Sequence, residues 1–230
     1  MTLVQKEHFL SSKSYVLRKS RITKAQRKAL TTLRKDYILK VGKNPLDFSE
    51  AFKKQGDFLI ADIGFGSGES LLSLAENNQN SNIIGIEVYP SGIGKVLNQI
   101  KQRNLTNLKV IHQDVTTLFK SFILNETFDY LIFLYPDPWP KRKHHKRRLL
   151  RKEFLDLVQK KLKPGGFFYC KTDWEEYFLN VEKEFSCQKG WLTLKEKDLP
   201  VVLKNLSKTN YENKAVKEGR TTLELLYRKG

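Results

Sequence analysis

Short apolar runs alternate with amphipathic stretches from residue 57 onward. Five runs have the length of strands: DFLIADI (57–63), NIIGIEV (82–88), NLKVIHQD (107–114), FDYLIFLY (128–135) and GFFYCKT (166–172). Helical patterns cover 70–77, 91–103, 147–162 and 174–186, and the tail (190–230) holds two or three more strand candidates, the clearest at 221–228. Alternating strands and helices predict an α/β fold built from βαβ units on a parallel sheet.

The first 45 residues have a different composition. They carry twelve Lys and Arg against two acids, with few large apolar residues. This segment predicts a basic arm with one helix near 24–40, and Thr23 is its candidate N-cap. The alternative is a disordered, solubilising tail.

The charge and the cysteines narrow the class of protein. The 230 residues carry a net charge of +17, which indicates a polyanionic partner, either nucleic acid or an anionic membrane surface. No apolar stretch approaches the roughly 18–20 residues of a membrane span. The basic run at 141–152 lacks a broad apolar face, which argues against a role at a membrane surface. Cys170 and Cys187 have no metal-ligand spacing, so we expect no metal site and a cytoplasmic protein.

Four acids stand where predicted strands end. Asp62, Glu87, Asp114 and Asp137 are 25, 27 and 23 residues apart, about one βα unit each time. The ligand of an open parallel sheet lies outside the carboxyl ends of its strands, so all four are expected at one cleft. A lone acid in such a place is more often a turn or helix-cap residue, and that alternative stays open for each of them.

The loop after the first strand carries Gly64, Gly66 and Gly68 and ends in Glu69. A nicotinamide fingerprint would need a glycine where Glu69 stands. The spacing G-x-G-x-G, followed by an acid at the end of the next strand, instead fits S-adenosyl-L-methionine. The glycine amides would face its methionine end, and Glu87 would take the ribose hydroxyls.

Residues 135–148, YPDPWPKRKHHKRR, place one acid among prolines and aromatic rings and then become basic. Pro136, Pro138 and Pro140 restrict the backbone around Asp137. Trp139 could stack on a base or pack the loop. Eight of the twelve residues at 141–152 are Lys or Arg, and we favour phosphate contact over a merely solvated helix face.

The chain resembles the bacterial tRNA (guanine-N7-)-methyltransferases. The resemblance rests on DIGFGSGE (62–69), GIEVYPSGI (85–93) and PDPWPKRKHHKRR (136–148), together with RITKAQ (21–26), KTDWEEY (171–177) and TNYENK (209–214). It implies a class I, Rossmann-like S-adenosyl-L-methionine-dependent methyltransferase with a mostly parallel seven-stranded sheet and a basic N-terminal extension. The implied organisation is an arm over 1–45 and a methyltransferase domain over 46–230.

The resemblance also implies an activity and roles for residues. The activity is methyl transfer to N7 of a guanine in the tRNA variable loop, position 46 of the tRNA. Cofactor contacts fall on Asp62, Glu87, Asp114 and Asp137, and Asp137 is also the catalytic residue. Substrate contacts fall on Lys141, Asp173, Thr209, Asn210, Tyr211 and Glu212, and RNA contacts on Lys143, His144, His145, Lys146, Arg147 and Arg148. Asp62 stands where many members have glutamate. No obligate protein partner is implied, and we expect a monomer or homodimer.

Two other readings stay open. An exocyclic amino-methyltransferase of the same fold would place Asp or Asn before Pro-Pro-aromatic at this strand end, where this chain has Asp-Pro-Trp-Pro. A non-catalytic RNA-binding protein could keep the fold, but it would have no need of the glycine loop and the acids. Asp173 could also be the N-cap of a helix starting at Trp174.

Overall fold

The computed structural model describes residues 14–15, 22–52, 54–204 and 206–230. The helices are α1 (Lys24–Thr32), α2 (Arg34–Tyr37), α3 (Glu69–Asn77), α4 (Pro90–Gln102), α5 (Val115–Ser121), α6 (Lys152–Lys161), α7 (Glu175–Ser186) and α8 (Asn210–Lys217). The strands are β1 (Leu59–Ile63), β2 (Asn82–Glu87), β3 (Leu108–His112), β4 (Phe128–Leu134), β5 (Leu162–Thr172), β6 (Trp191–Leu194) and β7 (Leu223–Lys229). Short 3₁₀ helices are η1 (Arg142–Arg147), η2 (Glu196–Asp198) and η3 (Val201–Leu203).

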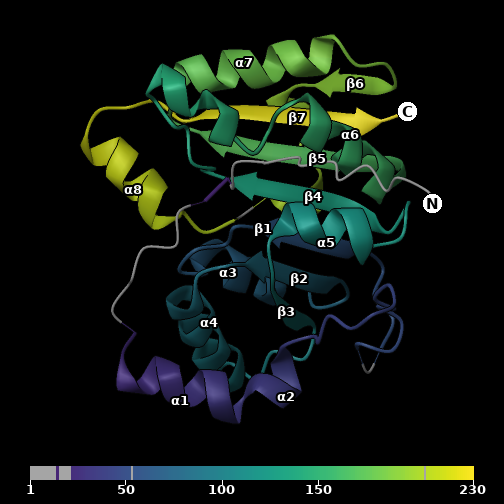
Figure 1. The fold of residues 1–230 in the computed structure, drawn as a ribbon, viewed down its shortest axis with the longest axis vertical. Coiled ribbons are helices and arrows are strands. Elements are labelled where there is room, and N and C mark those ends of the chain that lie inside the picture. Colours follow the sequence, from purple (N-terminus) through teal and green to yellow (C-terminus); the bar gives the residue numbers. More distant parts are fainter. Residues whose placement is uncertain (1–13, 16–21, 53, 205) are drawn as a thin grey trace, which may run out of the picture.

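The strands form one seven-stranded sheet in the order β3-β2-β1-β4-β5-β7-β6 (Figure 1). The pairs β1–β2, β1–β4, β2–β3 and β4–β5 are parallel, whereas β7 runs antiparallel to both β5 and β6. The sequence prediction of a mostly parallel, seven-stranded α/β sheet is therefore confirmed. The order reverses between β1 and β4, which opens a crevice at the carboxyl ends of these strands.

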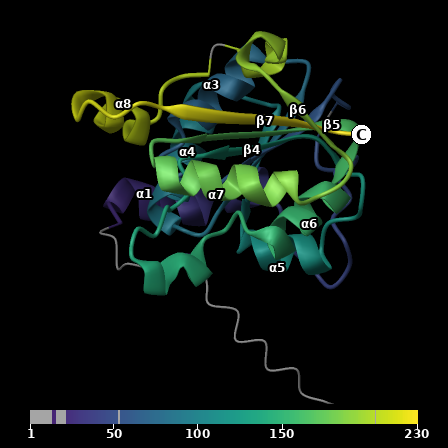
Figure 2. The same ribbon diagram turned by 90° about the horizontal axis from the view of Figure 1, so that it is seen from above.

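Both faces of the sheet are covered by helices, and each face has its own apolar core (Figures 1 and 2). Helices α5, α6 and α7 pack on one face, and α1, α3 and α4 on the other. Side chains alternate along β4, so Leu131 and Phe133 enter the first core while Tyr130 and Ile132 enter the second. This double burial explains why the run at 128–135 is almost wholly apolar.

Several boundaries differ from the predictions. The helix expected over 147–162 begins only at Lys152, because the basic residues before it form the 3₁₀ helix η1. Pro164 and Gly165 lie inside β5 and do not terminate that helix, which ends at Lys161. Helices α5 and α8 were not predicted at all.

The N-terminal helix packs on the body of the domain. Thr23 caps α1 through a capping box with Gln26, as the sequence predicts, and a break at Leu33 separates α1 from α2. The backbone of Gln26 comes so close to α4 that a Cβ on Gly94 would lie 2.7 Å from its carbonyl oxygen. Predictions for residues 1–13 and 16–21 lie outside the described residues, and the division at 45/46 stays a prediction.

Candidate active site

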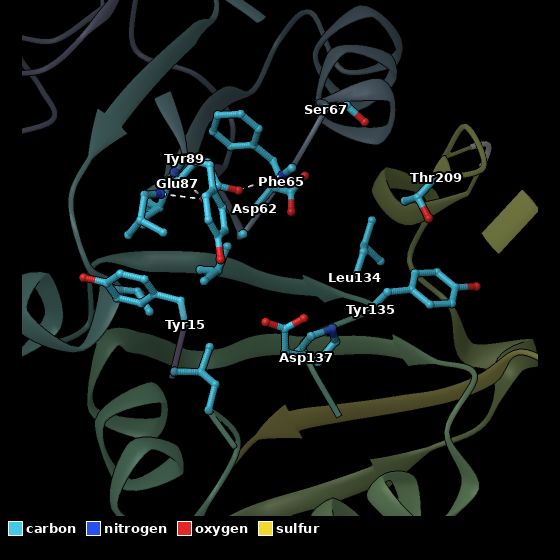
Figure 3. A pocket seen from close by; sticks show the side chains of 18 of the residues that line it. Tyr15, Asp62, Phe65, Ser67, Glu87, Tyr89, Leu134, Tyr135, Asp137 and Thr209 are labelled. Atoms are coloured by element: carbon cyan, nitrogen blue, oxygen red, sulfur yellow. Dashed lines mark hydrogen bonds between the residues drawn. The ribbon is translucent and has the colours of Figure 1, made fainter. Parts of the chain in front are cut away.

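A pocket opens at the carboxyl ends of β1, β2 and β4, where the strand order reverses (Figure 3). The structure brings the four strand-end acids, Asp62, Glu87, Asp114 and Asp137, to its wall. The wall also includes Ser14, Tyr15, Gly64, Gly66, Ser67, Glu69, Thr209, Asn210 and Tyr211. Residues from both ends of the chain therefore meet the strand ends at one site.

Asp62 ends β1 as a buried acid with unused hydrogen-bonding capacity. The residue is 2% exposed, and its Oδ1 atom has no hydrogen-bond partner among the described residues. Burial, reinforced by the negative charge of Glu87, raises the pKa of Asp62 to about 7. A buried acceptor without a donor is unfavourable, so this site suits a ligand that brings an N–H or ammonium group.

Glu87 is buried too, but the backbone holds both of its carboxylate oxygens. Oε2 accepts from the Gly66 amide at 2.8 Å, and Oε1 accepts from the amides of Val88 at 2.6 Å and Tyr89 at 3.0 Å. Burial raises the pKa of Glu87, these hydrogen bonds oppose the rise, and the charge of Asp137 adds to it. The fixed carboxylate presents its remaining lone pairs to the pocket, as an acceptor for hydroxyl groups must.

The glycine loop needs glycine for steric reasons. Gly64, Gly66 and Gly68 have φ of 73°, 56° and 83°. At Gly68, which precedes α3, a Cβ would in addition lie 2.1 Å from a methyl carbon of Val96 on α4. The loop can therefore approach a ligand with its backbone while α3 and α4 pack tightly behind it.

Asp114 is a helix-cap residue, the alternative that the sequence left open for each of the four acids. Its Oδ1 accepts from the amide and the hydroxyl of Thr117, both at 2.9 Å, and so caps α5. Capping does not remove the residue from the site, because Asp114 also lines the pocket.

Asp137 is exposed and points into the pocket from the loop after β4 (Figure 3). Tyr135 and Trp139 flank it with φ of 53° and 45°, which is unusual for residues other than glycine. Tyr135 is buried, and its hydroxyl lies 2.8 Å from Thr222 Oγ1. Trp139 packs in the loop, where its Nε1 donates to the Ser14 carbonyl at 3.1 Å.

The TNYE segment forms the first turn of α8. Thr209 caps α8 by accepting from the Glu212 amide at 3.0 Å. Asn210 Nδ2 reaches across to the glycine loop and donates to Ser67 Oγ at 2.9 Å and Glu69 Oε1 at 3.1 Å. The most C-terminal of the predicted site segments is thus fixed to the first one.

Three predicted substrate residues lie outside the pocket wall: Lys141, Asp173 and Glu212. Asp173 pairs with Arg220 at 2.8 Å, and Glu212 lies 3.9 Å from Lys171. Asp173 is not the N-cap of α7. That position belongs to Trp174, whose amide donates to Thr172 Oγ1, so this part of the prediction was wrong.

The basic residues after the loop form the 3₁₀ helix η1, in which some side chains are exposed and others contact the loop. Lys143 and Lys146 are exposed, and Arg147 lies over the Trp139 ring with its guanidinium 5.0 Å from the ring centre. His144 contacts the same ring edge-on, and His145 Nε2 lies 3.4 Å from the Pro140 carbonyl. Both histidines thus make contacts within the loop and the turn, and the RNA contacts implied for them stay predictions.

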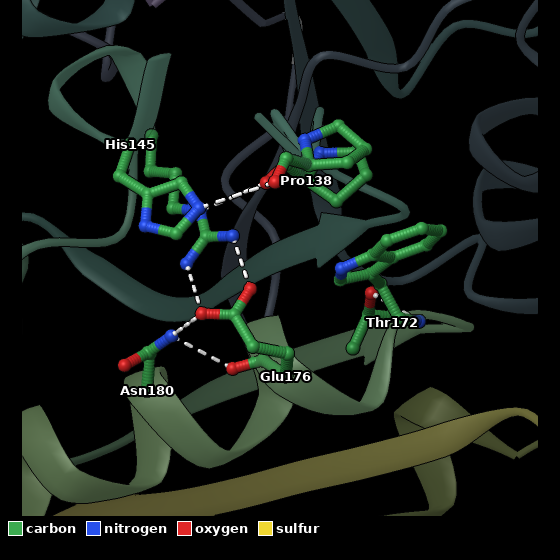
Figure 4. A network of polar contacts seen from close by, with 8 residues as sticks. Pro138, His145, Thr172, Glu176 and Asn180 are labelled. Atoms are coloured by element: carbon green, nitrogen blue, oxygen red, sulfur yellow. Dashed lines mark hydrogen bonds and ion pairs between the residues drawn. The ribbon is translucent and has the colours of Figure 1, made fainter. Parts of the chain in front are cut away.

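Arg148, in contrast, is buried, although we predicted an RNA contact. It pairs with Glu176, whose carboxylate also accepts from Asn180 (Figure 4). Sequence reasoning missed Glu176 and also Lys171, which links Glu212 to Glu224. Both stand inside the motif KTDWEEY, so the motif was the only available signal.

No group of three or more potential metal ligands occurs among the described residues. Within the same ranges, no helix is long and apolar enough to cross a membrane.

The strand order, the single antiparallel insertion of β7 and the glycine loop after β1 define the fold of class I S-adenosyl-L-methionine-dependent methyltransferases. Solved structures agree. The 16S rRNA methyltransferase KamB aligns with a TM-score of 0.54 and 14% identity over 92% of this chain and 95% of that one. An antibiotic-related methyltransferase aligns with a TM-score of 0.52 and 18% identity over 83% and 98%. At these identities the likeness concerns the fold alone.

Sequence relatives identify the family. A family model described as "Putative methyltransferase" matches residues 57–225. The tRNA (guanine-N(7)-)-methyltransferase of Nitrosococcus oceani is 36% identical over 216 residues, 94% of this chain and 90% of that protein. The enzyme of the same name from Francisella philomiragia is 40% identical over 173 residues, 75% of each chain. This chain therefore belongs to the tRNA (guanine-N7-)-methyltransferase family, which confirms the resemblance seen in its sequence.

Proposed function

We propose that this protein transfers a methyl group from S-adenosyl-L-methionine to N7 of a guanine in the variable loop of tRNA, at position 46. The observation that carries the proposal is the pocket itself. It gathers the buried, unsatisfied Asp62, the fixed Glu87 and the exposed Asp137 beside a strongly basic turn.

The residues present fit the cofactor. Asp62 would pair with the ammonium group, which supplies the donor that its buried Oδ1 lacks. Glu87 would accept from the ribose hydroxyls, and Gly66 and its neighbours would leave room for the methionine end. The cofactor supplies an electrophilic methyl group on a positively charged sulfur.

Methyl transfer to N7 requires the protein to position the guanine and the cofactor more than to move a proton. N7 of guanine has a free lone pair at neutral pH, so no proton has to leave before it attacks. Asp137 would accept from an N–H edge of the base and favour the positive charge that the purine ring gains. Its place in the loop after β4, between Pro136 and Pro138, suits that task.

The RNA would approach over the basic turn. Lys143, Lys146 and Arg147 would bind phosphates, and so would Lys141, which precedes the turn; the exposure of the three lysines supports this role. Folded RNA is recognised largely by shape and phosphate, which agrees with the excess of positive charge over the whole chain. The protein would act in the cytoplasm as a monomer or homodimer, without an obligate protein partner.

The deciding experiment incubates the protein with labelled S-adenosyl-L-methionine and an unmodified tRNA transcript, followed by nucleoside analysis. We expect 7-methylguanosine, and none when the variable-loop guanine is replaced. A methylated exocyclic amine would instead select the same-fold alternative. A binding protein without activity would keep tRNA affinity and transfer no label, and Asp137→Ala would then change nothing.

A further inference from the structure

Arg148, the C-cap that follows the basic 3₁₀ helix η1, is buried in the protein. Its side chain is only 4% exposed, and its guanidinium lies over the Tyr177 ring, 5.1 Å from the ring centre. Nε donates to the Pro138 carbonyl at 2.8 Å, and the two terminal nitrogens bind the two carboxylate oxygens of Glu176 (Figure 4). One side chain thus joins the loop after β4 to the first turn of α7.

These contacts and the burial of the side chain keep the guanidinium from recognising another ligand. Three of its five N–H donors bind one carbonyl and the two oxygens of one carboxylate, and the side chain is almost fully buried. A phosphate could pair with this fork only by displacing the Glu176 carboxylate, which also accepts a hydrogen bond from Asn180. Arg148 therefore differs from the exposed Lys143 and Lys146 of the same turn.

The loop that Arg148 holds needs an external support. Its residues on either side of Asp137, Tyr135 and Trp139, adopt positive φ without being glycine. Such conformations cost of order 1–3 kcal/mol each and persist only where surrounding contacts enforce them. The Pro138 carbonyl, one peptide away from Asp137, is the atom on which Arg148 acts.

We propose that Arg148 and Glu176 are positioning residues: together they hold the loop after β4 so that Asp137 faces the pocket, and Arg148 makes no contact with tRNA. This inference rests on the proposed function, in which Asp137 meets the reacting guanine. Displacing a reacting group by about 1 Å can lower a rate by about a hundredfold. We therefore expect loss of the pair to act on kcat and not on tRNA affinity.

Two substitutions separate positioning from RNA contact. Arg148→Lys keeps the charge but loses the planar fork, and kcat should fall about ten- to a hundredfold with tRNA affinity unchanged. Glu176→Gln removes the carboxylate charge that pairs with Arg148. The loop after β4 loses part of its support, so kcat should again fall. If Arg148 bound RNA, Glu176→Gln would free it, tighten tRNA binding and leave kcat at the wild-type value. That result would overturn the proposal.

The dependence of tRNA affinity on salt gives a second readout. Arg147→Ala should reduce the slope of log K against log salt by about 1, because one phosphate contact is lost. Arg148→Lys and Glu176→Gln should leave the slope unchanged. The double variant should have the kcat of the less active single variant, since both substitutions break the same Arg148–Glu176 pair. Arg148→Met removes the charge and should also leave the slope unchanged. A slope reduced in magnitude by about 1 in this variant, as for Arg147→Ala, would contradict the proposal.

Asp156→Asn is the matched control. Asp156 pairs with Lys152 at 3.0 Å on the exposed face of α6, so this substitution also converts a paired carboxylate to an amide, and kcat should not change. Thermal unfolding of each variant checks the fold. The Glu176 side chain is 50% exposed, so Glu176→Gln decides the question even if Arg148→Lys fails to fold. Absence of 7-methylguanosine with the wild type would refute the proposed function. An active wild type with unaffected variants would refute only the positioning role.

Discussion

Asp62 and Glu87 are buried at the ends of adjacent strands, and burial, reinforced by the charge of Glu87, raises the pKa of Asp62. The two acids differ in what holds them. Three backbone amides satisfy Glu87, whereas Asp62 Oδ1 has no hydrogen-bond partner in the part of the chain that the structure describes. Glu87 is therefore a fixed acceptor, whereas the ionised form of Asp62 would be stabilised by a positively charged ligand.

The first prediction concerns cofactor affinity and pH. Asp62 is mostly protonated below its pKa of about 7, and an ammonium group binds only the ionised form. Affinity for S-adenosylhomocysteine, measured by calorimetry, should therefore rise about tenfold from about pH 6 to about pH 8. Asp62→Asn should bind more weakly at the higher pH and lose this dependence. A wild-type affinity that is flat over this range would contradict the assigned role.

The same acid predicts a change of stability in the protein without cofactor. The pKa of Asp62 is raised on folding, so the folded state binds the extra proton and loses stability as pH rises from about 4 to about 7. Asp62→Asn removes this penalty. Its free energy of unfolding at about pH 8 should exceed that of the wild type by up to about 4 kcal/mol, a margin that shrinks towards about pH 4. Denaturant melts at both pH values test this, and an equal difference at both would exclude the ionisation as its cause.

A third prediction tests the glycine loop. Gly68→Ala forces a Cβ against Val96 at a backbone angle that alanine resists, so the loop must move. We expect affinity for S-adenosylhomocysteine to fall at least about tenfold and stability to fall by about 1–3 kcal/mol. Gly42→Ala is the control, because nothing lies within 4 Å of its Cβ position. Equal effects of the two substitutions would show that loop geometry is not the cause.

Local signals explain what the sequence predicted well. The burial of β4 on both faces follows from a run that is apolar except for Asp129, and the capping of α1 by Thr23 follows from residues three positions apart. Strand-end acids are predictable for the same reason, because each lies within three residues of the end of its own strand. The meeting of Asp62 and Asp137 at one pocket needs only the rule that parallel strands share an edge.

The errors concern contacts between distant segments. Nothing in the stretch at 141–152, with its eight Lys and Arg, indicates that the Arg148 side chain is buried while the other seven are not, because its partner Glu176 is 28 residues away. The contact from Asn210 to Ser67 joins positions 143 residues apart, and α8 itself is polar and carries one buried residue, Ala215. Helices of this kind depend on tertiary contacts, so their pattern in the sequence is weak.

The last prediction concerns Lys171, which lies between two acids behind the predicted substrate segment. Its Nζ is 3.0 Å from Glu224 and 3.9 Å from Glu212, and its side chain is 17% exposed. Lys171→Met would leave both acids without their cation, so we expect a loss of stability of about 1–3 kcal/mol and a higher KM for tRNA. Affinity for S-adenosylhomocysteine should not change, because Lys171 does not line the pocket. Lys214→Met breaks the exposed pair with Glu218 and should alter stability by no more than about 0.5 kcal/mol. Equal stability losses in the two variants, measured by denaturant unfolding, would show that the pairing of Lys171 has no special weight.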